Sequence, residues 1–312
     1  MSGFETRGLR RSHPGADGER REVLHGVDLR LESGENVALI GRSGCGKTTL
    51  LRALLLLDSP GPEDAGEILL DGEPVHRGGA RALRAFRRAV QYVPQDAAAT
   101  LHPRRSVLAQ VSTPLRTLGA VRHRDDADAR ARQVLDRLDI RREIWESQPH
   151  EISGGQAQRV SIARALALAP RYLLLDEPVS GLDPALRRQT LDLLAAIEAD
   201  SDAATSEADP DAGTSEANPD AKAGASGEAE PAPAGYCARP APAGYCARPA
   251  PALLVVSHDL AAVARVCQRA LVMDGGAIVE DAPMRRLLTR PAHPATRALR
   301  DAVPTLPTAA TD

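Results

Sequence analysis

Aromatic residues are scarce in this chain: two Phe, one Trp and four Tyr account for 2% of its 312 residues. Proteins that bind single strands of nucleic acid stack the bases on aromatic side chains, so this composition argues against that class of function. Charge of one sign does not dominate either, because 39 Lys and Arg against 42 Asp and Glu leave a net charge of −3. Without a basic surface that attracts phosphate backbones, we expect no nucleic-acid partner.

Long apolar runs are also missing. The richest run, residues 50–57, contains Arg52 and is followed by Asp58, and it is far shorter than the roughly 20 apolar residues that cross a bilayer. No apolar stretch follows the N-terminal arginines, so we predict no secretory signal. The four cysteines show no paired spacing, which fits a reducing compartment. We expect a soluble protein, for which any role at a membrane would have to come through a partner.

Short apolar runs that end in polar residues predict an α/β fold. Residues 37–40, 172–175 and 253–256 are uniformly apolar, as are strands buried on both faces of a parallel sheet. Residues 27–31 alternate apolar and polar, which predicts a half-buried strand. Between about 96 and 149 the pattern becomes helical and charged. A hydrophobic content of 43% is sufficient for a core.

Residues 200–252 differ from the rest in composition. They are rich in Ala, Pro, Gly, Ser, Asp and Glu, and they contain tandem repeats: PAPAGYCAR at 231–239 and 240–248, and TSEADPDAG at 205–213, nearly copied as TSEANPDAK at 214–222. Few large apolar side chains are present to offset the entropy cost of ordering, so we predict a disordered insertion. Cys237 and Cys246 recur with the repeat, and we interpret them as part of it rather than as zinc ligands.

A glycine-rich loop follows the predicted strand 37–40 and opens an apolar helix. Residues 41–48 fit G-x-x-x-x-G-K-[ST], the pattern of phosphate-binding loops, in the strand–loop–helix context that this pattern requires. Backbone N–H groups of such a loop and the helix N-terminus bind phosphate oxygens. We expect Lys47 to reach the β- and γ-phosphates and Thr48 to bind Mg²⁺, and the context disfavours a chance glycine-rich turn. The expected nucleotide-binding residues here are Gly41, Arg42, Ser43, Gly44, Cys45, Gly46, Lys47, Thr48 and Thr49.

A pair of carboxylates ends the predicted strand 172–175. Asp176 would support Mg²⁺, and Glu177 would orient and polarise the attacking water. On its own such a pair often only caps a strand end. Together with the phosphate loop it predicts a site that hydrolyses a nucleoside triphosphate, with ATP and Mg²⁺ as the expected ligands.

Ser153, Gly154, Gly155 and Gln156 open another helix. Serine and glycine are also common at an ordinary N-cap. Here the four residues stand between the two halves of the phosphate site and follow Pro-His-Glu-Ile at 149–152. This arrangement resembles the signature motif of the ABC (ATP-binding cassette) transporter ATPases. The resemblance implies that the signature helix of one subunit faces the γ-phosphate bound by another, so that ATP is sandwiched in a dimer.

Further landmarks of that family match this sequence. Gln95 in VPQD resembles the Q-loop glutamine that senses the metal and water, Asp183 in SGLD resembles the D-loop at the dimer interface, and His258 in VVSHD resembles the switch histidine. The resemblance covers about residues 23–199 and 253–304. It implies catalytic roles for Glu177, His258 and Gln95, nucleotide contacts from Ser153, Gly154, Gly155, Gln156 and Asp183, and Mg²⁺ binding through Thr48, Gln95 and Asp176.

The resemblance also implies the architecture: fold class α/β, a P-loop NTPase with a RecA-like core, an antiparallel β-subdomain and a helical signature subdomain. We assign the ATPase domain to residues 23–199 and 253–285, with the helical subdomain at about 96–165. The remaining parts are an N-terminal segment (1–22), the insertion (200–252) and a C-terminal tail (286–312).

Several stretches narrow the branch of the family. Residues 86–107, 149–156 and 293–304 resemble nickel- and peptide-import ATPases, and 267–280 favours the nickel-import members. Many peptide-import members carry a four-cysteine iron–sulfur tail, which the sequence after Cys267 does not supply. The cargo stays open between nickel, another metal complex and di- or oligopeptides. The implied partners, at the cytoplasmic face of the membrane, are a second ABC ATPase in a heterodimer, two membrane permease subunits and an extracytoplasmic solute-binding protein.

One departure from the family pattern and three rival functions stay open. Members usually stack an aromatic residue on adenine near the N-terminus; here His13 stands in that stretch, and either it stacks on the base or no side chain does. The rivals are an exporter ATPase, a soluble ABC ATPase of DNA repair or translation, and an inactive regulatory cassette. The intact Lys47, Asp176, Glu177 and His258 argue against the last.

Overall fold

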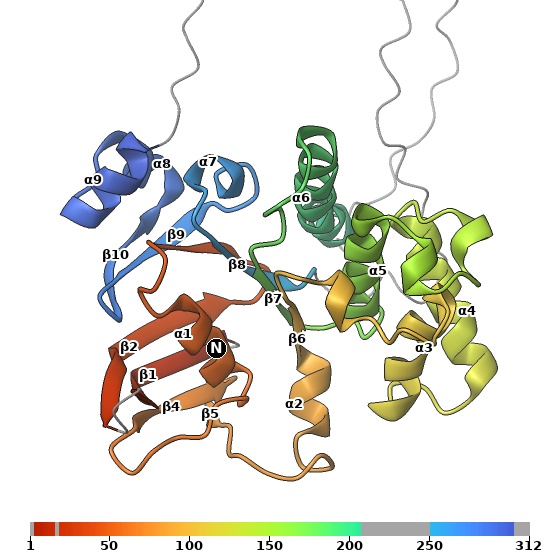
Figure 1. Ribbon diagram of the computed structural model, residues 1–312, viewed down its shortest axis with the longest axis horizontal. Coiled ribbons are helices and arrows are strands. Elements are labelled where there is room, and N and C mark those ends of the chain that lie inside the picture. The colour runs from red at the N-terminus through yellow and green to blue at the C-terminus, as the bar shows by residue number, and fades with distance from the viewer. Residues whose placement is uncertain (1–2, 16–18, 207–249, 303–312) are drawn as a thin grey trace, which may run out of the picture.

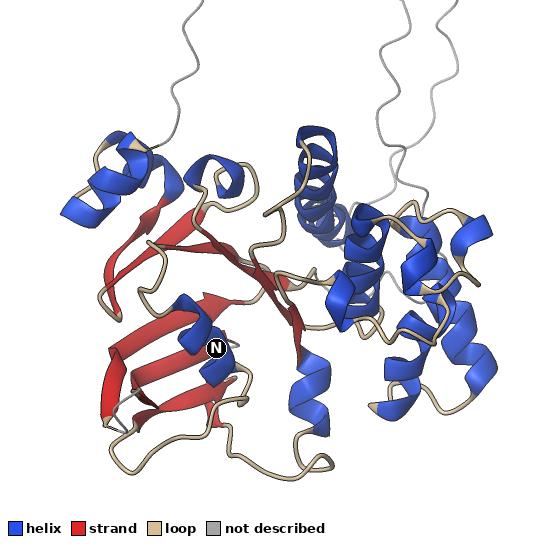
Figure 2. Cartoon of the chain, viewed as in Figure 1, coloured by secondary structure: helices blue, strands red, loops and turns tan. Residues whose placement is uncertain are grey.

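The computed structural model describes residues 3–15, 19–206 and 250–302 (Figure 1). Most of the predicted insertion, including Cys237 and Cys246, lies outside these residues, as does the end of the predicted tail. The described chain forms two β-sheets with helices beside them (Figure 2). Within the described ranges, no helix combines the length and the apolar composition that spanning a bilayer requires.

The larger sheet has six strands in the order β10-β9-β3-β8-β7-β6. Five of them run parallel, and β10 pairs antiparallel with β9 at one edge. Every residue of β3, β7 and β8 is buried, as their apolar sequences predict. This sheet confirms the α/β fold class. Its strands are β3 (Asn36–Ile40), β6 (Val90–Val93), β7 (Tyr172–Asp176), β8 (Ala252–Ser257), β9 (Arg269–Asp274) and β10 (Ala277–Pro283).

The smaller sheet is antiparallel, with the strand order β2-β1-β4-β5. The sequence analysis set residues 1–22 apart from the ATPase domain, but β1 lies inside this sheet and pairs with both β2 and β4. Register shifts, for example between Arg11 and Ser12, interrupt the alternation of β1, and sequence reading therefore missed the strand. The boundary at residue 23 is corrected accordingly. The strands are β1 (Gly3–Pro14), β2 (Arg20–Glu32), β4 (Ala65–Leu70) and β5 (Glu73–Pro74).

Helices cover the larger sheet and extend beyond its β6 edge. In Figure 1, α3, α4 and α5 form a group on that side, away from the smaller sheet. α6 continues to Ser206, so the regular structure reaches further into the predicted insertion than the sequence analysis expected. The helices are α1 (Lys47–Leu54), α2 (Arg84–Ala89), α3 (Val107–Thr117), α4 (Arg124–Arg137), α5 (Gly154–Leu166), α6 (Pro184–Ser206), α7 (Leu260–Val263), α8 (Met284–Thr289) and α9 (Pro294–Asp301), with 3₁₀ turns at Ala98–Thr100, Arg142–Ile144 and Pro149–Glu151.

Two hydrophobic cores lie on the two faces of the larger sheet. On β3, Val37 and Leu39 pack into the core shared with the smaller sheet and α1, whereas Ala38 and Ile40 pack into the core shared with α3, α4, α5 and α7. Successive side chains of a strand point to opposite faces, so an all-apolar strand supplies both cores. α1 is thereby fixed between the two sheets.

We expect Leu54→Ala, in the last turn of α1, to lower the free energy of unfolding by about 2–5 kcal/mol because it leaves a cavity in a packed core. Leu54 is 0% exposed, whereas Leu57, three residues later, is 56% exposed. Leu57→Ala is the matched control and should leave the stability within about 0.5 kcal/mol of wild type. Urea unfolding of the two variants measures the difference, and equal losses would contradict the packing described here.

Candidate functional site

The carboxyl ends of four neighbouring strands meet at one edge of the larger sheet. β3, β8, β7 and β6 lie side by side in this order, and their last residues pair within one position of each other. Because these strands are parallel, the residues that follow them gather along one edge, where open α/β sheets bind ligands. The residues predicted from sequence that follow these ends by one or two positions are Gly41, His258, Glu177 and Gln95.

The loop between β3 and α1 contacts the side chain of Lys47, the first residue of α1. Lys47 Nζ donates hydrogen bonds to the carbonyl oxygens of Gly41, at 2.6 Å, and Arg42, at 3.0 Å. Gly46 has φ 108°, and a Cβ there would lie 2.9 Å from Met273 Cε, so the loop path requires glycine. α1 begins at Lys47 with no side-chain cap, which leaves its first-turn N–H groups oriented for an anion. Arg42, Ser43, Gly44 and Thr48 are exposed, and Cys45 and Thr49 are buried.

Glu177 and His258 are in direct contact across β7 and β8. Glu177 Oε1 lies 2.7 Å from His258 Nδ1 and accepts a hydrogen bond from the His258 backbone N–H at 3.0 Å. Ser257 Oγ donates to Glu177 Oε2 at 3.4 Å. The Glu177 carboxylate is 12% exposed and the His258 imidazole is 64% exposed. The sequence predicted both residues as catalytic, and the structure brings them together.

Asp176 lies at the end of β7 beside a tyrosine that the sequence analysis did not single out. Tyr92, on β6, donates its hydroxyl to Asp176 Oδ2 at 3.1 Å. Burial raises the pKa of Asp176, and the neighbouring charge of Glu177 acts in the same direction, whereas Tyr92 and the Lys47 ammonium act against it. Burial also raises the pKa of Tyr92, so the phenol stays a donor. The bond fixes one oxygen of the carboxylate and leaves Oδ1 outside this contact.

The signature residues form the start of α5. Ser153 Oγ accepts a hydrogen bond from the Gln156 N–H at 3.3 Å, and Gln156 Oε1 accepts one from the Ser153 N–H at 2.8 Å, which together form a capping box. Gly155 packs against α6: a Cβ added at Gly155 would lie 2.2 Å from Leu186 Cδ2. α5 lies across the molecule from α1 in Figure 1. Within one chain, therefore, the signature residues and the phosphate loop are not brought together.

Asp183 caps the start of α6. Its Oδ1 accepts hydrogen bonds from the N–H groups of Ala185 and Leu186, both at 3.0 Å. One turn later, Arg187 forms an ion pair with Asp259, which follows His258 and caps α7 through the Ala262 N–H. This pair links the Asp183 turn to the His258 loop, and sequence reading had no signal for it because the partners are far apart in the chain.

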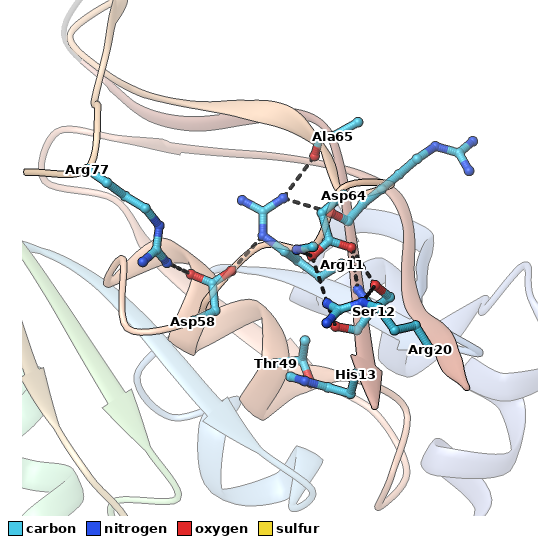
Figure 3. Close-up of polar contacts among 11 residues, drawn as sticks. Arg11, Ser12, His13, Arg20, Thr49, Asp58, Asp64, Ala65 and Arg77 are labelled. Carbon is cyan, nitrogen blue, oxygen red and sulfur yellow. Dashed lines mark hydrogen bonds and ion pairs between the residues drawn. The ribbon is translucent and has the colours of Figure 1, made fainter. Parts of the chain in front are cut away.

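His13 contacts the first turn of α1 from the end of β1. Its Nε2 lies 3.1 Å from Thr49 Oγ1, and its side chain is exposed (Figure 3). Stacking of His13 on adenine stays a prediction. Gln95 is exposed after β6, beyond the end of the sheet.

The comparisons with known proteins agree with this geometry. A sequence model of the ABC transporter family matches residues 24–180. The chain belongs to the ABC transporter family. As an ABC ATPase it is the ATP-hydrolysing subunit of a transport system. The nickel import ATP-binding protein NikE of Escherichia coli K12 is 35% identical over 94% of this chain and 90% of that protein, and NikE of Rhodospirillum rubrum is 38% identical over 93% and 86%.

Solved ABC structures show the same fold. The dimeric cassette MJ0796, in a post-hydrolysis state bound to ADP and Pi, has a TM-score of 0.66 and 22% identity, covering 90% of this chain and 99% of that one. CbiO1 from Clostridium perfringens, part of the ABC transporter complex cbiONQ, has a TM-score of 0.64 and 22% identity, covering 92% and 90%. At this identity the likeness supports the P-loop NTPase fold alone.

The oxygen donors of this ABC ATPase suit Mg²⁺. Magnesium prefers carboxylate, hydroxyl and other oxygen ligands and is usually shared with water and substrate phosphates. Thr48 and Gln95 are exposed next to the loop and strand ends, and Asp176 has its Oδ1 outside the contact with Tyr92. The three residues that the sequence predicted for the metal therefore supply a fitting donor set.

We expect Glu177→Gln to bind ATP as wild type does and to lower the turnover of ATP by about 10²–10⁴-fold. The amide keeps the size of the side chain and can still accept from the His258 N–H, but it cannot take a proton from water. Phosphate release and nucleotide binding measure the two effects separately. Glu73→Gln, at an exposed position of β5, is the control, and near wild-type turnover in Glu177→Gln would remove the catalytic assignment.

Proposed function

We propose that this chain is the ATP-hydrolysing subunit of an ABC importer that energises the uptake of nickel through a membrane permease. The observation that carries the proposal is the 35–38% identity to nickel import ATP-binding proteins over 93–94% of the chain. That similarity covers far more of the chain than residues 24–180, which the family model matches. Uptake of di- or oligopeptides is the alternative cargo, and the experiment below separates the two.

In the proposed reaction, ATP is the substrate and its phosphates lie in the 41–48 loop at the N-terminus of α1. Lys47 exchanges its bonds to the loop carbonyls for the β- and γ-phosphates. Thr48, Asp176 and Gln95 would hold Mg²⁺, and the bound ion would supply positive charge that offsets the charge of the phosphates. Glu177 orients and polarises the attacking water, and His258 fixes the Glu177 carboxylate by the 2.7 Å contact.

The proposal requires a second cassette. Ser153 and the glycines after it lie away from the phosphate loop of their own chain. In the proposed complex they contact the γ-phosphate held by a partner ATPase. The N–H groups at the start of α5 supply the positive end of a helix dipole there, and Asp183 lies at the same interface. We propose a heterodimer with a related ATPase, bound to two permease subunits at the cytoplasmic face of the membrane, with an extracytoplasmic solute-binding protein that delivers the cargo.

Two serine caps in this chain separate a signature role from a purely structural one. Ser153 caps α5, and Ser106 caps α3 by accepting from the Ala109 N–H at 3.4 Å. We expect Ser153→Ala and Ser106→Ala each to lower the free energy of unfolding by about 0.5–2 kcal/mol. Only Ser153→Ala should also reduce ATP turnover and ATP-dependent association of the cassettes, measured by phosphate release and light scattering. Equal effects of both variants on turnover would count against the signature role.

The transport assignment is tested by isolating the chain from membranes with its bound proteins and reconstituting them in vesicles. We expect ATP-dependent uptake of nickel with wild type and none with Glu177→Gln. Uptake of peptides without nickel would correct the cargo and keep the importer. Export of solute would favour an exporter, and salt-sensitive binding of nucleic acid in the absence of any permease would favour a soluble ABC ATPase of DNA repair or translation.

A further inference from the structure

Two aspartates with buried side chains contact the end of β1 beside α1, the helix that follows the phosphate loop (Figure 3). Asp58 and Asp64 both belong to the loop that connects α1 to β4. Their side chains are only 5% and 3% exposed. A buried carboxylate loses its hydration and is tolerated when hydrogen bonds and an opposite charge replace that hydration. Asp58 obtains both from Arg11 of β1. Asp64 obtains hydrogen bonds from Ser12 of β1 and an ion pair with Arg20 of β2, at 3.5 Å. The two aspartates thus contact consecutive residues of β1.

Asp58 binds Arg11. Arg11 Nε donates to Asp58 Oδ2 at 2.6 Å, and the Arg11 side chain is 9% exposed. Arg11 Nη1 also donates to the carbonyl oxygen of Ala65, at 2.9 Å, on the neighbouring strand β4. Arg77 binds the other oxygen of Asp58 from the outside. The Arg11 side chain is therefore held by hydrogen bonds to Asp58 in the loop and to Ala65 in the sheet.

Asp64 binds Ser12, the next residue. Its Oδ1 accepts from both the backbone N–H and the hydroxyl of Ser12, each at 2.7 Å, and its Oδ2 accepts from the Gly61 N–H at 2.7 Å. Arg20, at the start of β2, donates to the hydroxyl oxygen of Ser12 at 2.9 Å and to its carbonyl at 2.8 Å. Burial raises the pKa of Asp64, but the donors of Gly61 and Ser12 outweigh burial and hold that pKa below its usual value.

His13 follows Arg11 and Ser12 on β1, and its Nε2 lies 3.1 Å from Thr49 Oγ1. Thr49 is the third residue of α1, in the turn that follows the phosphate loop. His13 itself is exposed, so little packing orients its ring, and the position of the ring depends on the backbone that carries it. That backbone contains a register shift between Arg11 and Ser12, where the sheet ladder is irregular. The two aspartates supply at this point the bonds that the ladder does not.

We propose that Asp58 and Asp64 are positioning residues for nucleotide binding: they fix the end of β1 so that His13 stays against the first turn of α1 and forms a wall of the nucleotide site. This inference rests on the proposed function and adds to it residues that do not themselves contact the nucleotide. A wall that is ordered before binding reduces the conformational entropy lost when ATP binds, so the network acts on affinity rather than on the hydrolysis step.

The test is the dissociation constant of a fluorescent N-methylanthraniloyl-ATP for the full chain, in the Glu177→Gln background, where the nucleotide is not consumed. We expect Asp64→Asn to raise it by about three- to tenfold, the range for ordering one side chain on binding. In the otherwise active chain, KM should rise and kcat should not change. An unchanged dissociation constant would overturn the proposal.

Asp28→Asn is the matched control. Asp28 Oδ1 accepts from the backbone N–H of Gly8 at 2.6 Å, so it also ties a carboxylate to β1, but far from His13 along the strand. We expect the Asp28→Asn chain to bind the fluorescent ATP with the same dissociation constant as wild type. If Asp28→Asn weakens the nucleotide as much as Asp64→Asn does, a general loss of sheet stability explains both, and the positioning role is wrong.

A double-mutant cycle with His13→Ala tests the route of the effect. If the network acts through His13, Asp64→Asn has no further effect on affinity once His13 is removed, whereas equal effects in both backgrounds overturn that route. Ser12→Ala removes the hydroxyl and keeps the backbone bond to Asp64. It should give a smaller shift in the same direction, and it replaces Asp64→Asn if the latter does not fold.

Lys47→Ala separates this inference from the proposed function. Suppose that wild type binds the nucleotide and Lys47→Ala does not. If Asp64→Asn and Ser12→Ala then bind it with the dissociation constant of wild type, only the positioning role is overturned. A wild-type chain that binds no nucleotide overturns both.

Discussion

The hydrogen-bonding register of β3, β8, β7 and β6 is the constraint on which the site depends. It sets the phosphate loop, His258, Glu177 and Gln95 along one edge, because each follows its strand end by one or two residues. Asp176 is the last residue of β7 and pairs with Val256, so a slip of β7 by one residue would draw Glu177 into the sheet, where an unpaired charge costs several kcal/mol. The two cores specify the register, since each strand must fill one core with its odd and the other with its even positions.

The backbone of Glu177 shows how the fold turns a strand end into a catalytic edge. Its φ of 47° is in the left-handed region, which costs a residue with a side chain about 1–3 kcal/mol. The turn is held by the Glu177 N–H, which donates to the Val256 carbonyl at 2.9 Å, and by the bonds that the carboxylate accepts from His258 and Ser257. All of these partners lie on β8 or directly after it. The strained turn directs the carboxylate sideways onto the neighbouring strand end instead of into solvent.

The local parts of the site could be predicted from sequence, and the contacts between distant parts could not. The phosphate loop and the signature cap are contiguous residues whose order alone implies their conformation. The Tyr92–Asp176 and Arg187–Asp259 contacts join residues separated by 84 and 72 positions, and they exist only because particular strands and helices became neighbours. β1 was missed for a related reason: its irregular register removes the alternation by which strands are recognised, and its position between β2 and β4 is set by pairing rather than by its own sequence.

One continuous piece of chain, from the loop after β3 to the start of β4, connects the phosphate loop to β1. Its first part forms the phosphate loop, its middle is α1, and its last part carries Asp58 and Asp64, which bind Arg11 and Ser12 of β1. α1 is buried between the two sheets, with Leu50, Leu51 and Leu54 in the core. Because α1 lies between them in the chain, a shift of α1 would move both the phosphate loop and the loop that carries Asp58 and Asp64. The smaller sheet and the phosphate loop are thus joined through α1 on one face of the larger sheet, whereas α3, α4 and α5 pack into the core on the other face.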